Sequence, residues 1–228
     1  MNRILIILTL IILSSCSQSK RAYKSNAKTA ETLLNFECTD FDFKSVEEQS
    51  DSILLFIERA TNANSINRQK WEQKFFCAFP NSFVRMQEVF GYDDDKGAAP
   101  LYYYPSGKNI IQYFSQLESI PNPIYFDKYV KININGVWEA DNIQGAFDFD
   151  DRLLKDTKHA CNALSKFSNV EIKSVFRFIF DGPHPKNGDN AKIYKELSSK
   201  IDKQDKRLSK LLTKAYKKIM AEDDGHGH

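Results

Sequence analysis

Asp181 and His184 are the two residues of this chain best suited by type and spacing to acid–base chemistry. They belong to the segment Asp-Gly-Pro-His-Pro, in which the prolines on both sides restrict the backbone around the imidazole. A carboxylate beside a histidine is a common arrangement for proton transfer. No nucleophile motif accompanies the pair, so we assign no catalytic residue. A hydrolase that uses this pair, or acids within residues 139–151, is the third of our functional hypotheses.

Two acidic segments are the next candidates. The first, residues 92–105, starts with Asp93, Asp94 and Asp95 and ends with the aromatic run Tyr102, Tyr103 and Tyr104. The second, residues 139–151, contains Glu139, Asp141, Asp148, Asp150 and Asp151. Clustered carboxylates can bind Ca²⁺, but neither segment has the spacing of an EF-hand loop. We therefore predict no metal site and no cofactor.

Both segments have the composition of a protein-binding surface. A loop as long as 92–105 carries function more often than a short connection does. Aromatic residues beside charges are typical of the residues that dominate binding energy at interfaces, and acidic surfaces speed association with basic partners. The alternative is that both segments are plain solvated loops. We predict that a protein partner contacts their acids and tyrosines: Asp93, Asp94, Asp95, Tyr102, Tyr103, Tyr104, Glu139 and Asp141.

The first sixteen residues have the layout of a secretory signal. Arg3 is followed by ten residues in which only Thr9 is polar, and then by Ser14, Ser15 and Cys16. Ten apolar residues are too few for a stable membrane span, which needs about 20. The motif Leu13-Ser14-Ser15-Cys16 resembles the lipobox of bacterial lipoproteins. The resemblance implies cleavage before Cys16 and attachment of a diacylglyceryl group to its thiol.

A lipidated Cys16 implies a protein held on a membrane by its acyl chains. In enteric bacteria an aspartate directly after the lipidated cysteine favours retention in the inner membrane. This chain has Ser17 at that position, so we expect an outer-membrane location in the bacterial cell envelope. Residues 16–29 are mostly polar and small, which is typical of a tether. Residues 1–15 then form the signal peptide, 30–221 the globular domain and 222–228 a disordered tail.

The composition suits one globular domain. With residues 1–15 removed, the 228-residue chain keeps a length typical of one domain. Its 17 Phe and 10 Tyr, within a hydrophobic content of 42%, are ample for a core. The formal net charge of +2 argues against a dedicated nucleic-acid binder.

Three cysteines remain once Cys16 is lipidated. Cys77 and Cys161 stand in apolar surroundings, and we expect both to be small buried hydrophobic residues. Cys38 lies in a polar and aromatic segment and is the best candidate for a reactive or paired thiol. No C-x-x-C spacing is present, which argues against a thiol-redox or zinc site.

The apolar spacing predicts a mainly α domain, either a bundle or an irregular helical array. Capping boxes at Ser45/Glu48 and Ser168/Glu171 predict two helix starts. Gly91 is expected to end a helix in the left-handed conformation. The predicted helices, from their apolar stripes and breakers, are residues 46–60, 66–79, 82–90, 107–118, 152–166 and 168–180.

Two further segments are predicted to be helical, residues 124–143 and the C-terminal segment. Residues 124–143 fit a helix capped by Gly136, which we favour, but the alternation at 130–135 before Asn-Gly also fits a small hairpin near 130–138. The last segment has an apolar stripe from Ile193 to Ile219, which predicts one long C-terminal helix of about 45 Å. Residues 186–218 also hold eleven Lys or Arg and four acids. This basic face has two interpretations, a solvated surface or a surface for anionic lipid or an acidic partner.

Three hypotheses follow. The first is a membrane-anchored envelope lipoprotein that acts as a non-enzymatic protein-binding module, and in its sharper form an immunity protein that neutralises a toxin from a neighbouring cell. The second is a structural or assembly lipoprotein of the envelope, and the third is the hydrolase.

Overall fold

Side-chain caps set several helix starts in the computed structural model. Ser45 accepts a hydrogen bond from the N–H of Glu48 at the start of α2 (Val46–Asn62), and Asn64 caps α3 (Ser65–Ala78) in the same way. At the start of α10 (Asn169–Phe180), Ser168 and Glu171 form the predicted capping box. Each cap satisfies an amide that has no partner within its helix.

The structure describes residues 36, 38, 41–103, 107–138, 143, 147, 149–182, 184–186 and 188–222. Its mainly α character confirms the predicted fold class. The chain divides into two compact units, residues 1–39 and 40–228, and all the named elements belong to the second. The remaining elements are α4 (Phe83–Phe90), β1 (Tyr92–Asp93), β2 (Gly97–Ala98), α5 (Gly107–Ser115), α6 (Asn122–Asn133), α8 (Phe149–Lys155), α9 (Thr157–Leu164), α11 (Gly188–Gln204) and α12 (Lys206–Ala221).

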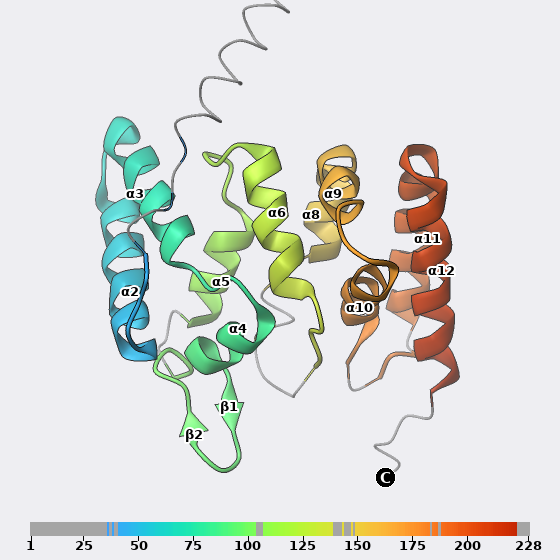
Figure 1. Cartoon of the computed structure of the whole chain (residues 1–228), viewed down its shortest axis with the longest axis horizontal. Coiled ribbons are helices and arrows are strands. Elements are labelled where there is room, and N and C mark those ends of the chain that lie inside the picture. Colours follow the sequence, from blue (N-terminus) through green and yellow to red (C-terminus); the bar gives the residue numbers. More distant parts are fainter. Residues whose placement is uncertain are drawn as a thin grey trace, which may run out of the picture. The chain divides into compact units, whose positions relative to one another are not determined.

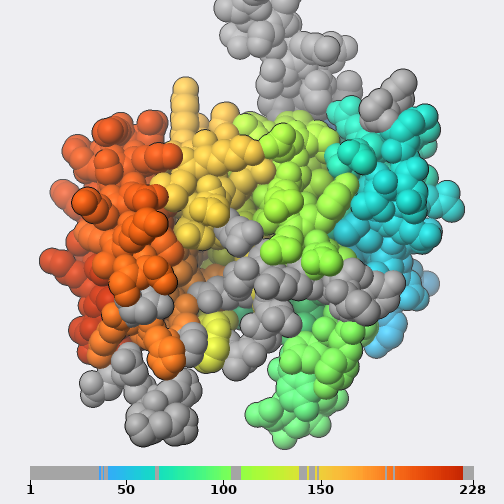
Figure 2. All heavy atoms as spheres, turned by 180° about the vertical axis from the view of Figure 1, so that it is seen from behind, coloured from blue at the N-terminus to red at the C-terminus, as the bar shows by residue number. Residues whose placement is uncertain are grey.

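Within residues 40–228 the helices form an irregular array rather than a regular bundle (Figure 1). The antiparallel pair α2–α3 lies at one end of the array and the pair α11–α12 at the other. Helices α4, α5, α6, α8, α9 and α10 fill the space between them. The β1–β2 hairpin projects beyond the helices, as both Figure 1 and Figure 2 show.

Aromatic rings form the centre of the array. Phe114 of α5 stacks on Phe79 with ring centroids 4.0 Å apart, and Tyr125 of α6 packs on Phe114 at 5.6 Å. All three rings are fully buried. Phe76 and Phe147 extend the cluster on either side. Burial of such large apolar surfaces is the main favourable term in folding.

The C-terminal end of α3 is closed by side chains from other helices. The buried Lys128 ammonium of α6 donates to the carbonyl oxygens of Phe76 and Phe79 at 2.5 Å. Gln49 of α2 donates to the carbonyl oxygen of Ala78 at 2.7 Å. These bonds satisfy carbonyl groups that a helix end leaves without partners. Burial lowers the pKa of Lys128 well below its ordinary value.

The favoured helix at 124–143 is confirmed in its first part, as α6, and the alternative hairpin near 130–138 is wrong. The described strands lie instead at residues 92–98, in a segment expected to be a loop. The left-handed residue after α6 is Asn135, with φ 58°, rather than Gly136. Gly136 serves close packing, because a Cβ there would meet the ring of Phe178 at 2.6 Å.

The expected single C-terminal helix is wrong, because the chain turns back between α11 and α12. Asp205 leaves the helical conformation and caps α12 by accepting from the N–H groups of Arg207 and Leu208. The two halves then pack on each other through Tyr194 and Tyr216, whose rings stack at 4.2 Å. The apolar stripe therefore continues through two antiparallel helices. Apolar periodicity alone does not distinguish one long helix from two helices that fold back on each other.

Three smaller expectations are also corrected. Residues 152–166 form two helices, α8 and α9, separated at Asp156. Cys77 is buried as expected but is disulfide-bonded, as is Cys38. Gly91 ends α4 with φ −86°, so it is not a left-handed cap.

Cys161 is the free, buried thiol that its surroundings predicted. Burial and then the nearby Asp205 raise the pKa of Cys161 to about 12. Among the described residues, no helix has the length and apolar content to cross a bilayer.

Candidate functional site

An open groove of about 690 Å³ lies between α4, the β1–β2 hairpin and the segment after α6. The start of α2 contributes Val46 and Glu47 to its wall. Helix α4 contributes Phe83, Val84, Gln87 and Glu88, and the other lining residues are Gly91, Tyr92, Asp93, Lys96–Pro100, Asn135 and Val137. We call this site the hairpin groove.

Exposed apolar side chains gather at the hairpin groove. Within the described residues, six large hydrophobic side chains are exposed, and three of them line this groove: Val84 at 70%, Tyr92 at 45% and Val137 at 39%. They come from α4, from β1 and from the segment after α6, which are separate parts of the sequence. Scattered exposed apolar residues are normal, but convergence of several on one hollow is typical of a binding site.

Helix α4 presents Val84 to solvent because its other apolar residues anchor it from the opposite side. Ser82 caps the helix, and Phe83, Met86, Val89 and Phe90 are buried. Phe83 packs edge-on against Phe178 of α10 with centroids 5.2 Å apart. Val84 is therefore an apolar residue outside the buried face of its helix.

The hairpin is held at its base and shaped at its tip. At the base, the N–H of Leu101 donates to the carbonyl oxygen of Val89 at 3.0 Å, and the Leu101 side chain is buried. At the tip, Asp93 Oδ1 accepts from the N–H groups of Asp95 and Lys96 at 3.0 and 2.9 Å. Gly97 takes a φ of 83°, which favours glycine. These contacts fix where Tyr92 and the three aspartates lie.

A polar network connects the groove to the core. Arg85 of α4 donates to Gln49 Oε1 at 2.6 Å, to the Ser45 carbonyl oxygen at 3.2 Å and to Glu88 Oε2 at 2.6 Å. Gln49 in turn caps the end of α3. The start of α2 and helix α4 are thereby fixed relative to each other, and with them the groove residues Glu47 and Glu88.

The rim of the groove is acidic. Glu47, Glu88 and Asp93 line it together with one basic residue, Lys96, and Asp94 and Asp95 extend the acidic surface to the exposed hairpin tip. The N–H groups of Lys96 and Asp95 hold the pKa of Asp93 below its ordinary value. The backbone N–H of Glu47 and the Ser45 hydroxyl lower the pKa of Glu47. Both carboxylates are therefore ionised at neutral pH.

The structure brings together part of the predicted partner-binding set. Asp93, Asp94 and Asp95 are exposed on the hairpin. The ring of Tyr102 packs on Tyr92 with centroids 5.4 Å apart, and Tyr103, which is 76% exposed, lies against Tyr102 at 4.8 Å. Tyr104, Glu139, Asp141 and the lipidation residue Cys16 lie outside the described residues.

Sequence reasoning missed the apolar part of this site. Val84 had a detectable signal, because it is apolar yet falls outside the stripe formed by Phe83, Met86 and Phe90. Val137 had none, because the fold alone brings the end of α6 to α4.

Asp181 and His184, the candidate residues for acid–base chemistry, do not form a pair in the structure. The Asp181 carboxylate accepts from Arg177 Nη1 at 2.8 Å and from the N–H of Trp138 at 3.1 Å. Arg177 also reaches Glu222 at the end of α12. His184 is exposed, and within the described part of the chain it makes no hydrogen bond or ion pair. Asp181 serves as a junction between α10 and the segment after α6.

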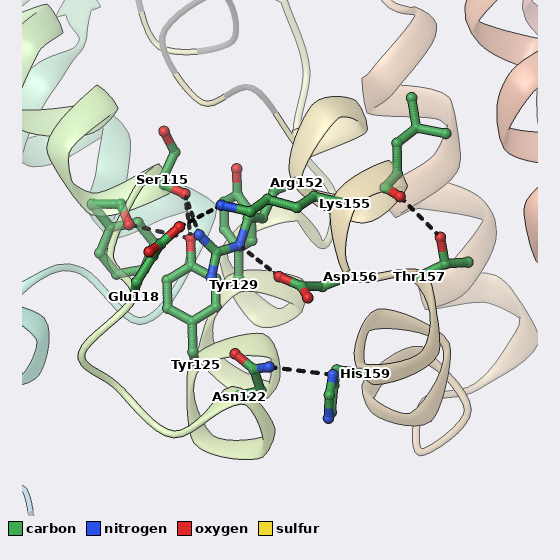
Figure 3. Close-up of polar contacts among 12 residues, drawn as sticks. Ser115, Glu118, Asn122, Tyr125, Tyr129, Arg152, Lys155, Asp156, Thr157 and His159 are labelled. Atoms are coloured by element: carbon green, nitrogen blue, oxygen red, sulfur yellow. Dashed lines mark hydrogen bonds and ion pairs between the residues drawn. The ribbon is translucent and has the colours of Figure 1, made fainter.

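A second polar cluster lies around the buried Arg152 of α8 (Figure 3). Its guanidinium lies 4.4 Å from the ring centre of Tyr125 and 3.5 Å from the Asp156 carboxylate. Tyr125 donates to the carbonyl oxygen of Ser115 at 2.9 Å, and Arg152 Nη1 lies 3.4 Å from the same oxygen. The cluster joins α5, α6 and α8 in the interior, so we assign it a role in positioning helices.

Among the described residues, no group of three or more His, Cys, Asp or Glu side chains is arranged to hold a metal ion. No protein-family model, curated protein or solved structure matches this chain.

Proposed function

We propose that this protein is a lipid-anchored lipoprotein of the bacterial cell envelope that binds another protein in the hairpin groove. The single observation that supports this most strongly is the convergence of Val84, Tyr92 and Val137 on one acidic-rimmed hollow. The motif ending at Cys16 supports the anchor, and Ser17 supports an outer-membrane location.

The groove has the composition of a protein interface. Interfaces combine an apolar centre with a polar rim, and tyrosine is enriched among the residues that dominate their binding energy. Val84 and Val137 supply apolar surface in the groove, while Tyr92, Tyr102 and Tyr103 form a continuous aromatic edge beside it. The contacts at the hairpin base and through Arg85 position these groups before binding, which reduces the entropy cost of association.

The charges of the rim specify the chemistry of the partner. Glu47, Asp94 and Asp95 form no ion pair within the described residues, so their charges are available to a ligand. A complementary partner presents lysine or arginine side chains around an apolar or aromatic residue that enters the groove. Complementary charge of this kind raises the association rate and orients the partner.

Immunity is the specific form of this function that we favour. A small anchored module that recognises a basic protein suits neutralisation of a toxin that arrives from a neighbouring cell. Cells that lack the protein should be killed by toxin-producing neighbours, and the wild-type chain should restore survival. Restored survival with Val84→Glu, at a level equal to wild type, would count against recognition through the groove. If loss of the protein instead disturbs envelope assembly in pure culture, the structural alternative is favoured.

Photo-crosslinking tests the binding site directly. Val84 and Val170 are matched valines, 70% and 69% exposed, but only Val84 lines the groove. In cells grown together with toxin-producing neighbours, we expect a photoreactive residue at position 84 of the full chain to give a discrete protein adduct, whereas the same residue at position 170 gives none. Equal adducts from both positions, or no adduct from position 84, would overturn the proposal.

A further inference from the structure

The pair α11–α12 has a lysine-rich outer face. Each helix spans about 25 Å at 1.5 Å per residue. Leu197, Ile201, Leu208 and Leu212 are buried on the inner side, and the exposed basic residues repeat at helical spacing on the opposite side. They are Lys192, Lys195 and Lys203 on α11 and Lys206, Lys210, Lys214, Lys217 and Lys218 on α12. We call these residues the lysine face.

Helices α11 and α12, which carry the lysine face, lie together at one end of the array (Figures 1 and 2). The stacked rings of Tyr194 and Tyr216 and the hydrogen bond between Tyr194 and Thr213, at 3.1 Å, hold the two helices together. Asp205 fixes the turn between them. The basic residues of both helices are thereby kept on one surface.

Most of these charges are not neutralised by the protein. Lys206 pairs with Asp202, and Lys218 lies 3.9 Å from Glu222. Within the described residues, the side chains of the other members of the lysine face make no hydrogen bond or ion pair: Lys192, Lys195, Lys203, Lys210, Lys214 and Lys217. Six such lysines outnumber the exposed acids Asp189 and Glu196 on α11, so the pair α11–α12 carries an excess of positive charge.

The chemistry of this face favours a lipid surface over a protein partner. The described residues of α11 and α12 include no exposed large hydrophobic side chain. The single arginine, Arg207, is already bound to Asn169 and to the Ser165 carbonyl oxygen. Tight protein interfaces rely on tyrosine, tryptophan and arginine. Lysines are mobile point charges on flexible chains, and they suit a fluid layer of anionic headgroups.

We infer that the lysine face docks the folded domain on an anionic bilayer. The inference does not require the hairpin groove, and its test leaves that proposal untouched. Lysine footprinting of the full chain measures the docking of the lysine face on vesicles. The chain is acetylated with an amine-reactive ester in the presence of phosphatidylcholine vesicles, either pure or mixed with phosphatidylglycerol. Acetylation at each lysine is then quantified by mass spectrometry.

Lys195, Lys203 and Lys214 should be acetylated several-fold more slowly with the anionic vesicles than with the neutral ones, because attraction to the anionic headgroups holds these lysines against the bilayer. Lys44, Lys70 and Lys131 are equally exposed internal controls from α6 and the α2–α3 end, and their rates should not change. Protection should disappear in about 1 M salt, where the screening length is about 3 Å.

A variant separates docking from simple crowding at the membrane. In the triple variant Lys195→Gln, Lys203→Gln and Lys214→Gln, the remaining Lys210 should lose its protection. In the matched variant Lys44→Gln, Lys70→Gln and Lys131→Gln, Lys210 should stay protected. Protection that is equal for both vesicle types, equal for both lysine sets, or absent throughout would overturn the inference.

Discussion

Lys128 shows how one side chain holds the centre of this molecule together. Its ammonium is buried beneath the end of α3 and donates to backbone carbonyl oxygens there, while it lies 4.9 Å from the ring centre of Phe76. A lysine in a segment with alternating polar residues reads from the sequence as exposed. Only the fold shows that α6 packs against the C-terminal end of α3, where carbonyl groups lack partners within the helix. The role of Lys128 could therefore not be predicted from the sequence.

Replacement of Lys128 by methionine should lower the free energy of unfolding by about 2 kcal/mol, because buried carbonyl oxygens lose their donor. Lys131→Met is the matched control, since Lys131 is exposed on the same helix, and it should change stability by less than about 0.5 kcal/mol. Urea denaturation measures both. Equal effects of the two substitutions would show that the carbonyl contacts do not matter.

The conformation of the hairpin tip depends on the ionised carboxylate of Asp93, which accepts hydrogen bonds from the N–H groups of Asp95 and Lys96. Amide donors lower its native pKa below the ordinary value of 3.8. Because the native pKa lies below the unfolded one, this contribution to stability is complete above pH 3.8 and is lost as the pH falls through the native value. The amide resonance of Lys96 should therefore shift with a titration midpoint below pH 3.8. A midpoint above pH 3.8 would contradict this assignment.

At the scale of elements, the caps at helix N-termini were the dependable signals. The starts of α2 and α10 follow from Ser45/Glu48 and Ser168/Glu171, because the bonds that make a cap lie within four residues. The division of the C-terminal stripe at Asp205 was not predictable in the same way. Whether an apolar stripe continues or folds back depends on tertiary packing, here of Tyr194 on Tyr216.

Gly91 links α4 to the hairpin at a position that has no room for a side chain. A Cβ at this position would lie 2.8 Å from the Gln87 carbonyl oxygen and 3.0 Å from Gln87 Cα. Gly91→Ala should therefore destabilise the protein by about 1–3 kcal/mol and shift the amide resonance of Tyr92. At Gly188 a Cβ meets no atom within 4 Å, so Gly188→Ala should be close to neutral. Thermal unfolding of both variants tests this, and a neutral Gly91→Ala would contradict the packing argument.

At the scale of the whole domain, opposite charges occupy different surfaces. The hairpin tip and groove carry uncompensated carboxylates, whereas the lysine face carries uncompensated ammonium groups. The sequence indicated both charge clusters and the acidic and aromatic part of the proposed binding site, because these are runs along the chain. It did not predict the groove, since Val84 and Val137 lie more than fifty residues apart and meet only through the packing of α4 and α6.

The central claim is that a partner protein binds in the hairpin groove. It is tested most directly by the affinity of two matched variants for the partner identified by crosslinking at position 84. Val84→Glu and Val170→Glu place the same charge at equally exposed valines, inside and outside the hairpin groove. Isothermal titration with the purified partner should give a Kd at least about tenfold weaker for Val84→Glu, equivalent to ~1.4 kcal/mol, and an unchanged Kd for Val170→Glu. An unchanged Kd for Val84→Glu, or an equal loss in both variants, would contradict binding in the groove.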